Sequence, residues 1–156
     1  MQGVTSANTS LNQIPSVWKS IDYENVERIL DYGCGKYDKF KEFIESKGIE
    51  YFGYDKYNRS DEENYNALHS CPDLIVCANV LNVIDNTYEI FEILEFISTY
   101  NKPVVFSIYE GDKSGVGRVT KKDCYQRNQK TKDYVMMIEL FFSKVKRKGN
   151  VIFAEN

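Results

Sequence analysis

The chain has 156 residues, of which 42% are hydrophobic and 28% are charged, and its formal net charge is −3. These proportions are those of a globular chain and exclude a disordered or fibrous one, and the length suits one domain over residues 1–156. No apolar run approaches the ~20 residues that span a membrane, so we expect a cytoplasmic protein with no membrane partner.

Hydrophobic spacing and turn residues predict alternating helices and strands. Residues 1–10 are small and polar, which predicts a mobile arm or a loop laid over a site, and a short helix follows Pro15. Residues 56–72 are rich in turn formers, with one short strand at 65–68. Strands are otherwise expected at 26–32, 50–54, 73–78 and 103–109, and helices at 38–47 and from Asp85 or Asn86 to about residue 100.

The C-terminal third predicts a flexible loop, a helix and a hairpin. The loop is expected at residues 111–117, a basic helix at 121–139, and two strands within 140–154 that turn at Lys148-Gly149-Asn150. Strands that alternate with helices imply an α/β, Rossmann-like fold with a mostly parallel sheet covered on both faces. The C-terminal hairpin would add an antiparallel edge to this sheet.

The charges are unevenly distributed along the chain. Basic residues greatly outnumber acidic ones within residues 111–150, so the acidic excess lies in the rest of the chain. This asymmetry favours an anionic partner such as a nucleic acid for the basic region, with a merely solvated basic face as the alternative. The expected contacts are Arg118, Lys121, Lys122 and Arg127.

The cysteines and the single histidine give no metal signature. The four cysteines form no CxxC motif, and His69 has no neighbour at the spacing of metal ligands, so we expect reduced thiols and no metal. We favour an exposed or capping role for His69, with an adenine contact or general-base catalysis as alternatives.

The first strand ends in the motif Asp31-Tyr32-Gly33-Cys34-Gly35. Ligands of open α/β sheets bind outside the carboxyl ends of the strands, and two glycines there let the backbone approach a ligand closely. A dinucleotide fingerprint would need a third glycine, where this chain has an aspartate at position 38. The carboxylate of Asp31 suits an ammonium group, such as that of S-adenosylmethionine, better than a pyrophosphate.

Polar residues also follow the other predicted strands. Asp55, after the second strand, can accept hydrogen bonds from both hydroxyls of a ribose. Asn79, after the strand at 73–78, is expected beside the methionine portion or the reactive methyl group, and Asn82 turns inward or caps the next segment. Tyr109 and Glu110 would border the same cleft, so the candidate catalytic residues are Asn79, Tyr109 and Glu110.

The segments DYGCG (residues 31–35), GYDKYN (53–58) and DLIVCANVLNVI (73–84) together resemble class I S-adenosylmethionine-dependent methyltransferases. They are similar to a narrower group, the methyltransferases associated with DNA phosphorothioation systems and related phage and bacterial proteins. The resemblance covers residues 26–110. It implies that Gly33 and Gly35 pack under the methionine portion, that Asp31 helps to hold it and that Asp55 binds ribose. The remaining expected cofactor contacts are Tyr32, Cys34, Lys56, Asn79 and Val80.

The chain departs from the family in two respects. The residue that binds adenine in the family has no clear counterpart, because the segment 56–72 offers only Asn64, Asn66 and His69. Asn79 is not followed by Pro-Pro-aromatic, the signature of DNA amino-methyltransferases, and Cys71 precedes rather than follows Pro72, which argues against cytosine C5 methylation.

Three functions remain open at this point. The first is a methyltransferase that acts on a nucleic acid or nucleotide, as the basic region suggests. The second is a methyltransferase for a small molecule, and the third is a non-catalytic module that binds S-adenosylmethionine or a nucleotide within a larger assembly. The methyl acceptor and the oligomeric state cannot be derived from the sequence.

Overall fold

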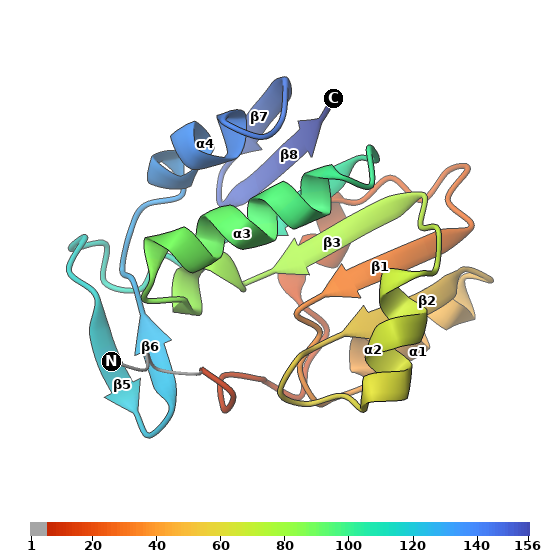
Figure 1. Ribbon diagram of the computed structural model, residues 1–156, viewed down its shortest axis with the longest axis horizontal. Helices are drawn as coiled ribbons and strands as arrows, with labels where there is room; N and C mark the ends of the chain where they lie inside the picture. The colour runs from red at the N-terminus through yellow and green to blue at the C-terminus, as the bar shows by residue number, and fades with distance from the viewer. Residues whose placement is uncertain (1–5) are drawn as a thin grey trace.

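The computed structural model describes residues 6–156 and is drawn in Figure 1. Within this range six strands form one sheet, in the order β2-β1-β3-β4-β8-β7, and two more form a separate pair, β5-β6. The first four strands are parallel, and β8 and β7 are antiparallel, so the predicted sheet and C-terminal hairpin are confirmed. The sheet strands are β2 (Glu50–Tyr54), β1 (Arg28–Tyr32), β3 (Leu74–Ala78), β4 (Val104–Ser107), β8 (Val151–Glu155) and β7 (Lys144–Lys148).

The strand order reverses at β1. The chain leaves β1 to form β2 on one side and then crosses over to form β3 on the other side. Since all three strands are parallel, their carboxyl ends lie at one edge of the sheet with a crevice between the two connections. Ligands of open α/β sheets bind at such a switch point, so the topology itself marks this edge as the place for a site.

Helices cover both faces of the sheet. Figure 1 shows α3 in front of it, on the face that also receives α2 and α4, while α1 and the 3-10 helix η1 cover the opposite face. Successive strand residues point to opposite faces of the sheet. Leu30 therefore packs in the core beneath α3, while Ile29 and Asp31 point towards α1. These helices are α3 (Thr87–Ser98), α2 (Asp61–Leu68), α4 (Lys132–Glu139), α1 (Lys39–Ser46) and η1 (Ser16–Ser20).

Several helix ends confirm the sequence analysis. η1 follows Pro15, α1 lies within the predicted range, and Gly48 just beyond it has a φ of +75°. The predicted cap Asn86 precedes α3, and its side-chain oxygen accepts a hydrogen bond from the backbone N–H of Tyr88 at 2.9 Å. No helix within residues 6–156 is long and apolar enough to cross a membrane.

The short strand predicted at residues 65–68 is wrong, because these residues end the helix α2. Ser60 caps this helix, since its hydroxyl oxygen accepts a hydrogen bond from the N–H of Glu63 at 3.1 Å. The hydroxyl in turn lies 3.2 Å from the Glu63 carboxylate. The run Ser60-Asp61-Glu62-Glu63 has the spacing of a capping box and places three acids at the positive end of the helix.

The basic helix predicted at residues 121–139 is wrong over its first half. This region forms the hairpin of β5 (Arg118–Lys121) and β6 (Cys124–Gln126), and the helix α4 begins only at Lys132. Asp123 and Asn128 have φ values of +56° and +58°, which interrupt a right-handed helix at both positions. Figure 1 shows the hairpin on the side to which the arrows of β1 and β3 point.

Candidate functional site

A cavity of about 910 Å³ opens at the carboxyl ends of the parallel strands. Ordinary ligand sites span roughly 300–1,000 Å³, so this one lies towards the upper end of that range. Its walls come from the strand ends, from the segment before η1 and from the β5-β6 hairpin. The predicted site residues that line it are Asp31, Tyr32, Gly33, Cys34, Gly35, Asp55, Lys56, Asn79, Val80, Tyr109 and Lys121.

Residues 6–10 lie along this cavity. The Ser6 hydroxyl donates a hydrogen bond to the carbonyl oxygen of Val83, and Ser10 Oγ accepts one from the N–H of Lys36 at 3.2 Å. The sequence analysis expected a mobile arm or a loop over a site here. The structure shows the loop for residues 6–10, while residues 1–5 lie outside the described residues.

The glycine turn (residues 33–35) is bound to the end of β2. The N–H groups of Gly33 and Cys34 both donate to the carbonyl oxygen of Tyr54, at 2.7 and 3.0 Å. The N–H of Gly35 donates to Oδ2 of Asp55 at 2.8 Å. The turn and the predicted ribose-binding acid therefore form one hydrogen-bonded unit.

Both glycines of the turn are required by conformation and by space. Gly33 and Gly35 have φ values of +82° and +72°, which residues other than glycine rarely adopt. A Cβ on Gly33 would collide with Val80, and a Cβ on Gly35 would collide with the Ser10 hydroxyl. The turn can pack this closely against Val80 and Ser10 only because neither glycine carries a side chain.

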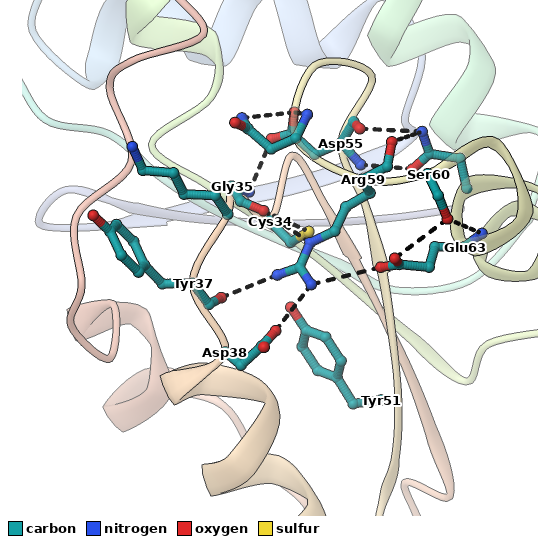
Figure 2. A network of polar contacts seen from close by, with 12 residues as sticks. Cys34, Gly35, Tyr37, Asp38, Tyr51, Asp55, Arg59, Ser60 and Glu63 are labelled. Atoms are coloured by element: carbon teal, nitrogen blue, oxygen red, sulfur yellow. Dashed lines mark hydrogen bonds and ion pairs between the residues drawn. The ribbon is translucent and has the colours of Figure 1, made fainter.

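Arg59 holds the loop that follows the turn, as Figure 2 shows. Its Nε donates to the carbonyl oxygen of Gly35 at 2.9 Å, and a terminal nitrogen donates to the carbonyl oxygen of Tyr37 at 3.1 Å. The other terminal nitrogen lies 2.9 Å from the Asp38 carboxylate and 3.6 Å from that of Glu63. Because the Arg59 side chain is only 12% exposed, this guanidinium acts as a buried clamp on residues 35–38.

Asp31 is buried beneath the turn. Its carboxylate accepts a hydrogen bond from the hydroxyl of Tyr51 at 2.5 Å, and the residue is only 4% exposed. Burial raises the pKa of Asp31 to about 7, although the hydrogen bond from Tyr51 and the charge of Arg59 oppose this rise. Burial likewise raises the pKa of Cys34 to about 12, so its thiol stays protonated and is no nucleophile.

The Asp55 carboxylate is already engaged with the protein. Oδ1 accepts hydrogen bonds from the N–H groups of Tyr57 and Asn58, at 3.0 and 3.1 Å, and from the Asn58 side chain at 3.1 Å. Among residues 6–156, Oδ2 accepts a hydrogen bond only from the Gly35 N–H. A carboxylate oxygen has about two lone-pair sites, so Oδ2 keeps one free for a ligand.

The three candidate catalytic residues lie in different surroundings. Asn79, with a φ of +57°, and Tyr109, which is 62% exposed, both line the cavity. Glu110 is not among the lining residues, and its carboxylate accepts the N–H of Thr131 at 2.9 Å, just before α4. Asn82 is buried and accepts the N–H of Arg127 on its backbone oxygen at 2.9 Å, so it holds the hairpin region.

The four basic candidates also differ from one another. Lys121 lines the cavity, and Lys122 is exposed in the hairpin turn beside it. Arg118 forms a surface ion pair with Asp112 at 3.0 Å. Arg127 instead donates to the carbonyl oxygens of Ile84 and Asp85, at 2.9 and 3.2 Å, and so binds the protein itself.

The three adenine-side candidates do not line the cavity. The Asn64 side chain accepts the N–H of Asp55 at 3.0 Å and donates to the Asp55 carbonyl oxygen at 3.1 Å, so it shapes the loop after β2. Asn66 is exposed on α2. His69 follows the helix, stacks on Tyr65 with 4.1 Å between ring centroids, and bonds to the Tyr65 carbonyl oxygen, which is the favoured capping role.

The sequence analysis missed Arg59 and Tyr51 as residues that shape the site. Arg59 lies four residues after Asp55 in a segment interpreted as polar turns, and two of its four partners are backbone oxygens, which leave no mark in a sequence. Side chains alternate between the two faces of the sheet along β2, and Tyr51 points to the same face as Asp31. Within residues 6–156, no three His, Cys, Asp or Glu side chains gather as a metal site would require.

Comparison with known proteins shows the fold of this chain but does not show its family. No family model matches the chain, and no curated protein matches it. Among solved structures, the chain is similar to PigF with SAH (S-adenosylhomocysteine), with 13% identity and a TM-score of 0.55 over 88% of this chain. PigF is a methyltransferase, and the chain spans about half of it, 52%. This likeness shows that the chain has the fold of an S-adenosylmethionine-dependent methyltransferase.

Proposed function

We propose that this chain binds S-adenosylmethionine in the cavity at the carboxyl ends of β1, β2 and β3, and transfers its methyl group to a nucleic acid or nucleotide. The observation that carries the proposal is the glycine turn at the switch point of the sheet, with the buried carboxyl of Asp31 beneath it. The fold shared with PigF, whose structure contains SAH, supports the same cofactor.

The residues of the cavity fit the two ends of this cofactor. The methionine portion carries an ammonium group, for which Asp31 offers a carboxylate that ionises near neutral pH. Gly33 and Gly35 both line the cavity, so the turn forms the part of the wall against which this portion would lie. Asp55 has one acceptor position left on Oδ2, so it would accept one ribose hydroxyl rather than the two that the sequence analysis expected.

The proposed reaction needs little acid–base chemistry from the chain. The bound cofactor supplies a methyl group that its sulfonium already activates, and the chain then contributes alignment and exclusion of water. Asn79 and Tyr109 line the cavity and are the candidates for orienting the acceptor. Glu110 would act indirectly, because its carboxylate holds the N–H of Thr131.

The acceptor is proposed from the charge around the cavity. Lys121 lines it and Lys122 adjoins it in the hairpin turn, which suits a phosphate-bearing acceptor. The resemblance to methyltransferases associated with DNA phosphorothioation systems favours a nucleic acid in the same way. A neutral small molecule would gain nothing from these lysines.

Titration calorimetry with S-adenosylmethionine and with SAH tests the binding half of this proposal. Both should bind one per chain, and Gly33→Ala should weaken both at least about tenfold, because the new Cβ meets Val80 and crowds the turn. Gly149→Ala is the matched control, since Gly149 has a φ of +61° but open space around it. Binding of neither ligand would contradict the proposal.

Formation of SAH from S-adenosylmethionine tests the transfer half. Turnover should require an added oligonucleotide or nucleotide. Turnover with small neutral acceptors alone would replace the proposed acceptor class. Cofactor binding without turnover on any acceptor would reduce the chain to a binding module.

A further inference from the structure

We propose that Tyr109 and the β5-β6 hairpin form the acceptor subsite, and that it holds an unpaired nucleobase by stacking while Lys121 and Lys122 bind the adjoining phosphates. The inference deepens the proposed function, on which it rests for the reaction. It concerns binding of single-stranded nucleic acid, which can be measured without the cofactor.

The cavity has two chemically different walls. The first is the cofactor wall, made of the glycine turn with Asp31 and Asp55. The second is the acceptor wall, which consists of the lining residues in the hairpin and after β4: Tyr109, Thr120, Lys121, Cys124, Tyr125 and Gln126. A cavity of about 910 Å³ with two such walls has the layout that a transfer between two ligands needs.

The acceptor wall is anchored to the core of the protein. Cys124 and Gln126 on β6 are 1% and 7% exposed. Immediately after β6, the N–H of Arg127 donates to the backbone oxygen of Asn82 at 2.9 Å, and its guanidinium binds the carbonyl oxygen of Ile84 at 2.9 Å. The hairpin is therefore a fixed wall, and a ligand would not have to order it.

The loop that leads into the hairpin is held in the same way. The Asn128 side chain accepts the N–H of Asp112 at 3.2 Å and donates to the carbonyl oxygen of Val116 at 2.9 Å. The backbone oxygen of Asn128 accepts the N–H of Gly115 at 2.8 Å. These bonds join both ends of residues 112–128 and fix the direction in which the hairpin projects.

Two tyrosines of the acceptor wall offer flat apolar surface. Tyr109 lies just after β4 and is 62% exposed although it lines the cavity. Tyr125 also lines the cavity, and its hydroxyl end lies where a side chain of Gly117 would stand, so the glycine makes room for it. Tyrosine rings are stacking platforms for unpaired bases, and every base has a face that can use them.

The charge beside these rings is positive. Lys121 and Lys122 are exposed at the tip of the hairpin, and neither makes an ion pair among residues 6–156. By contrast, Arg118 at the base of β5 is paired with Asp112 at 3.0 Å. Two unpaired ammonium groups next to aromatic rings match a phosphate chain next to its bases.

Stacking on the rings of Tyr109 and Tyr125 favours an unpaired base over a base in a duplex. Both faces of a base in a duplex are covered by its neighbours, so a base must leave the stack before it can reach rings that line a cavity. A single strand incurs a much smaller cost for this step. A small carboxylate or phosphate compound would use the lysines but leave the surface of Tyr109 uncovered.

Fluorescence anisotropy with a labelled single strand of ~12 nucleotides tests the inference at about 50 mM NaCl. The strand should bind at least about tenfold more tightly than the same sequence as a duplex. Tyr109→Ala should weaken binding by about tenfold, while Tyr109→Phe, which keeps the ring, should stay within about twofold of the parent. Tyr88→Ala is the matched control, since Tyr88 is 77% exposed on α3 and outside the cavity.

The lysines are tested through the salt dependence of the same binding. Lys121→Gln with Lys122→Gln should lower the slope of log affinity against log salt by about 1.4, two phosphate contacts on a single strand. Lys146→Gln with Lys148→Gln on β7 removes the same charge outside the cavity lining and should leave the slope unchanged.

The outcomes separate this inference from the proposed function. Equal binding of single strand and duplex, with no effect of Tyr109→Ala, would overturn the stacking subsite and leave only a basic surface. Absence of any nucleic-acid binding in a protein that binds SAH by calorimetry would overturn the subsite and the nucleic-acid acceptor, and would leave the cofactor proposal standing. Single-strand binding that depends on Tyr109 in a protein that does not bind SAH would support the subsite and overturn the cofactor proposal.

Discussion

The two walls of the cavity satisfy their polar groups in opposite ways. On the cofactor wall, Asp31 is bonded to Tyr51, Asp55 accepts four hydrogen bonds from the protein, and Arg59 binds two backbone oxygens and two carboxylates. On the acceptor wall, Tyr109 and Lys121 are exposed. The first wall is organised before any ligand arrives, whereas the second leaves its interactions for a ligand to make.

This difference predicts how stability and binding respond to substitution. Removing a side chain from the cofactor wall leaves buried partners without hydrogen bonds, so it should lower the free energy of unfolding as well as the affinity. Removing an exposed side chain from the acceptor wall should change binding alone. The following substitutions, taken in order of expected effect, can break or sharpen this contrast.

The largest effect should come from Asp31 and should depend on pH. Its pKa is about 7 in the folded protein against about 3.9 in an unfolded chain, so the folded state binds more protons between about pH 4 and 7. The free energy of unfolding should therefore fall as the pH rises through this window, by on the order of 3 kcal/mol. Asp31→Asn keeps an acceptor for the Tyr51 hydroxyl and should lack this fall in urea titrations at both ends of the window.

Tyr51→Phe sharpens the same measurement. The Tyr51 hydroxyl donates to the Asp31 carboxylate and favours its ionised form, so its removal should raise the pKa of Asp31 further and extend the loss of stability to higher pH. Parallel pH profiles for the parent protein and Asp31→Asn would mean that Asp31 titrates at its ordinary value. The cofactor wall would then hold no carboxyl group whose pKa is raised by burial.

The next effect should come from Arg59. Arg59→Gln removes the donors to the carbonyl oxygens of Gly35 and Tyr37 and should cost about 2 kcal/mol of unfolding free energy in urea titrations. Arg28→Gln is the control, because Arg28 pairs with Glu50 where the side chains are 43% and 63% exposed. That exposed pair should be worth less than about 0.5 kcal/mol. Equal losses for both variants would contradict the role of Arg59 as a clamp.

Gly35 should follow, with an effect that has two parts. Gly35→Ala introduces strain at a φ of +72° and a collision with the Ser10 hydroxyl, whereas Gly48→Ala introduces strain at a φ of +75° in open space. The strain alone costs about 1 kcal/mol, so Gly48→Ala measures it and the excess for Gly35→Ala measures the collision. Adding Ser10→Gly should remove that excess, which thermal unfolding of the three variants would show. An excess that survives Ser10→Gly would mean that other atoms crowd the turn.

The parallel sheet and the glycine turn at the carboxyl end of β1 were largely predictable from the sequence, because local rules decide them. A β-branched run such as Ile75 and Val76 predicts a buried strand, and Gly33 and Gly35 directly after a strand predict a turn at its carboxyl end. The position of Arg59 was not predictable in this way. Three of its four partners lie 21 to 24 residues away, and two of these three are backbone oxygens, which no pattern of residue types records.

The acceptor wall was mispredicted because two rules conflicted there. The basic and apolar residues after position 121 can be read with helical spacing, yet Asp123 and Asn128 adopt left-handed conformations that end it. Asp and Asn are the residues that adopt this conformation most readily after glycine, so the signal was present but weak. Because of this error, the sequence analysis treated the four basic candidates as one set of ligand contacts. In the structure, two lie at the hairpin tip, one forms a surface ion pair and one binds backbone oxygens of the protein.

The smallest effect on stability should therefore come from the hairpin tip, and it separates the two lysines there from Arg127. Lys121→Gln with Lys122→Gln removes two exposed ammonium groups that make no ion pair within residues 6–156, so the unfolding free energy should change by less than about 0.5 kcal/mol. Arg127→Gln, a few residues further on, leaves the carbonyl oxygens of Ile84 and Asp85 without their donor and should cost about 1–2 kcal/mol. Urea unfolding at the same pH and salt compares the two directly. A loss above about 1 kcal/mol for the lysine pair would mean that the tip is bound to the protein like the cofactor wall, and the contrast between the two walls would fail at that point.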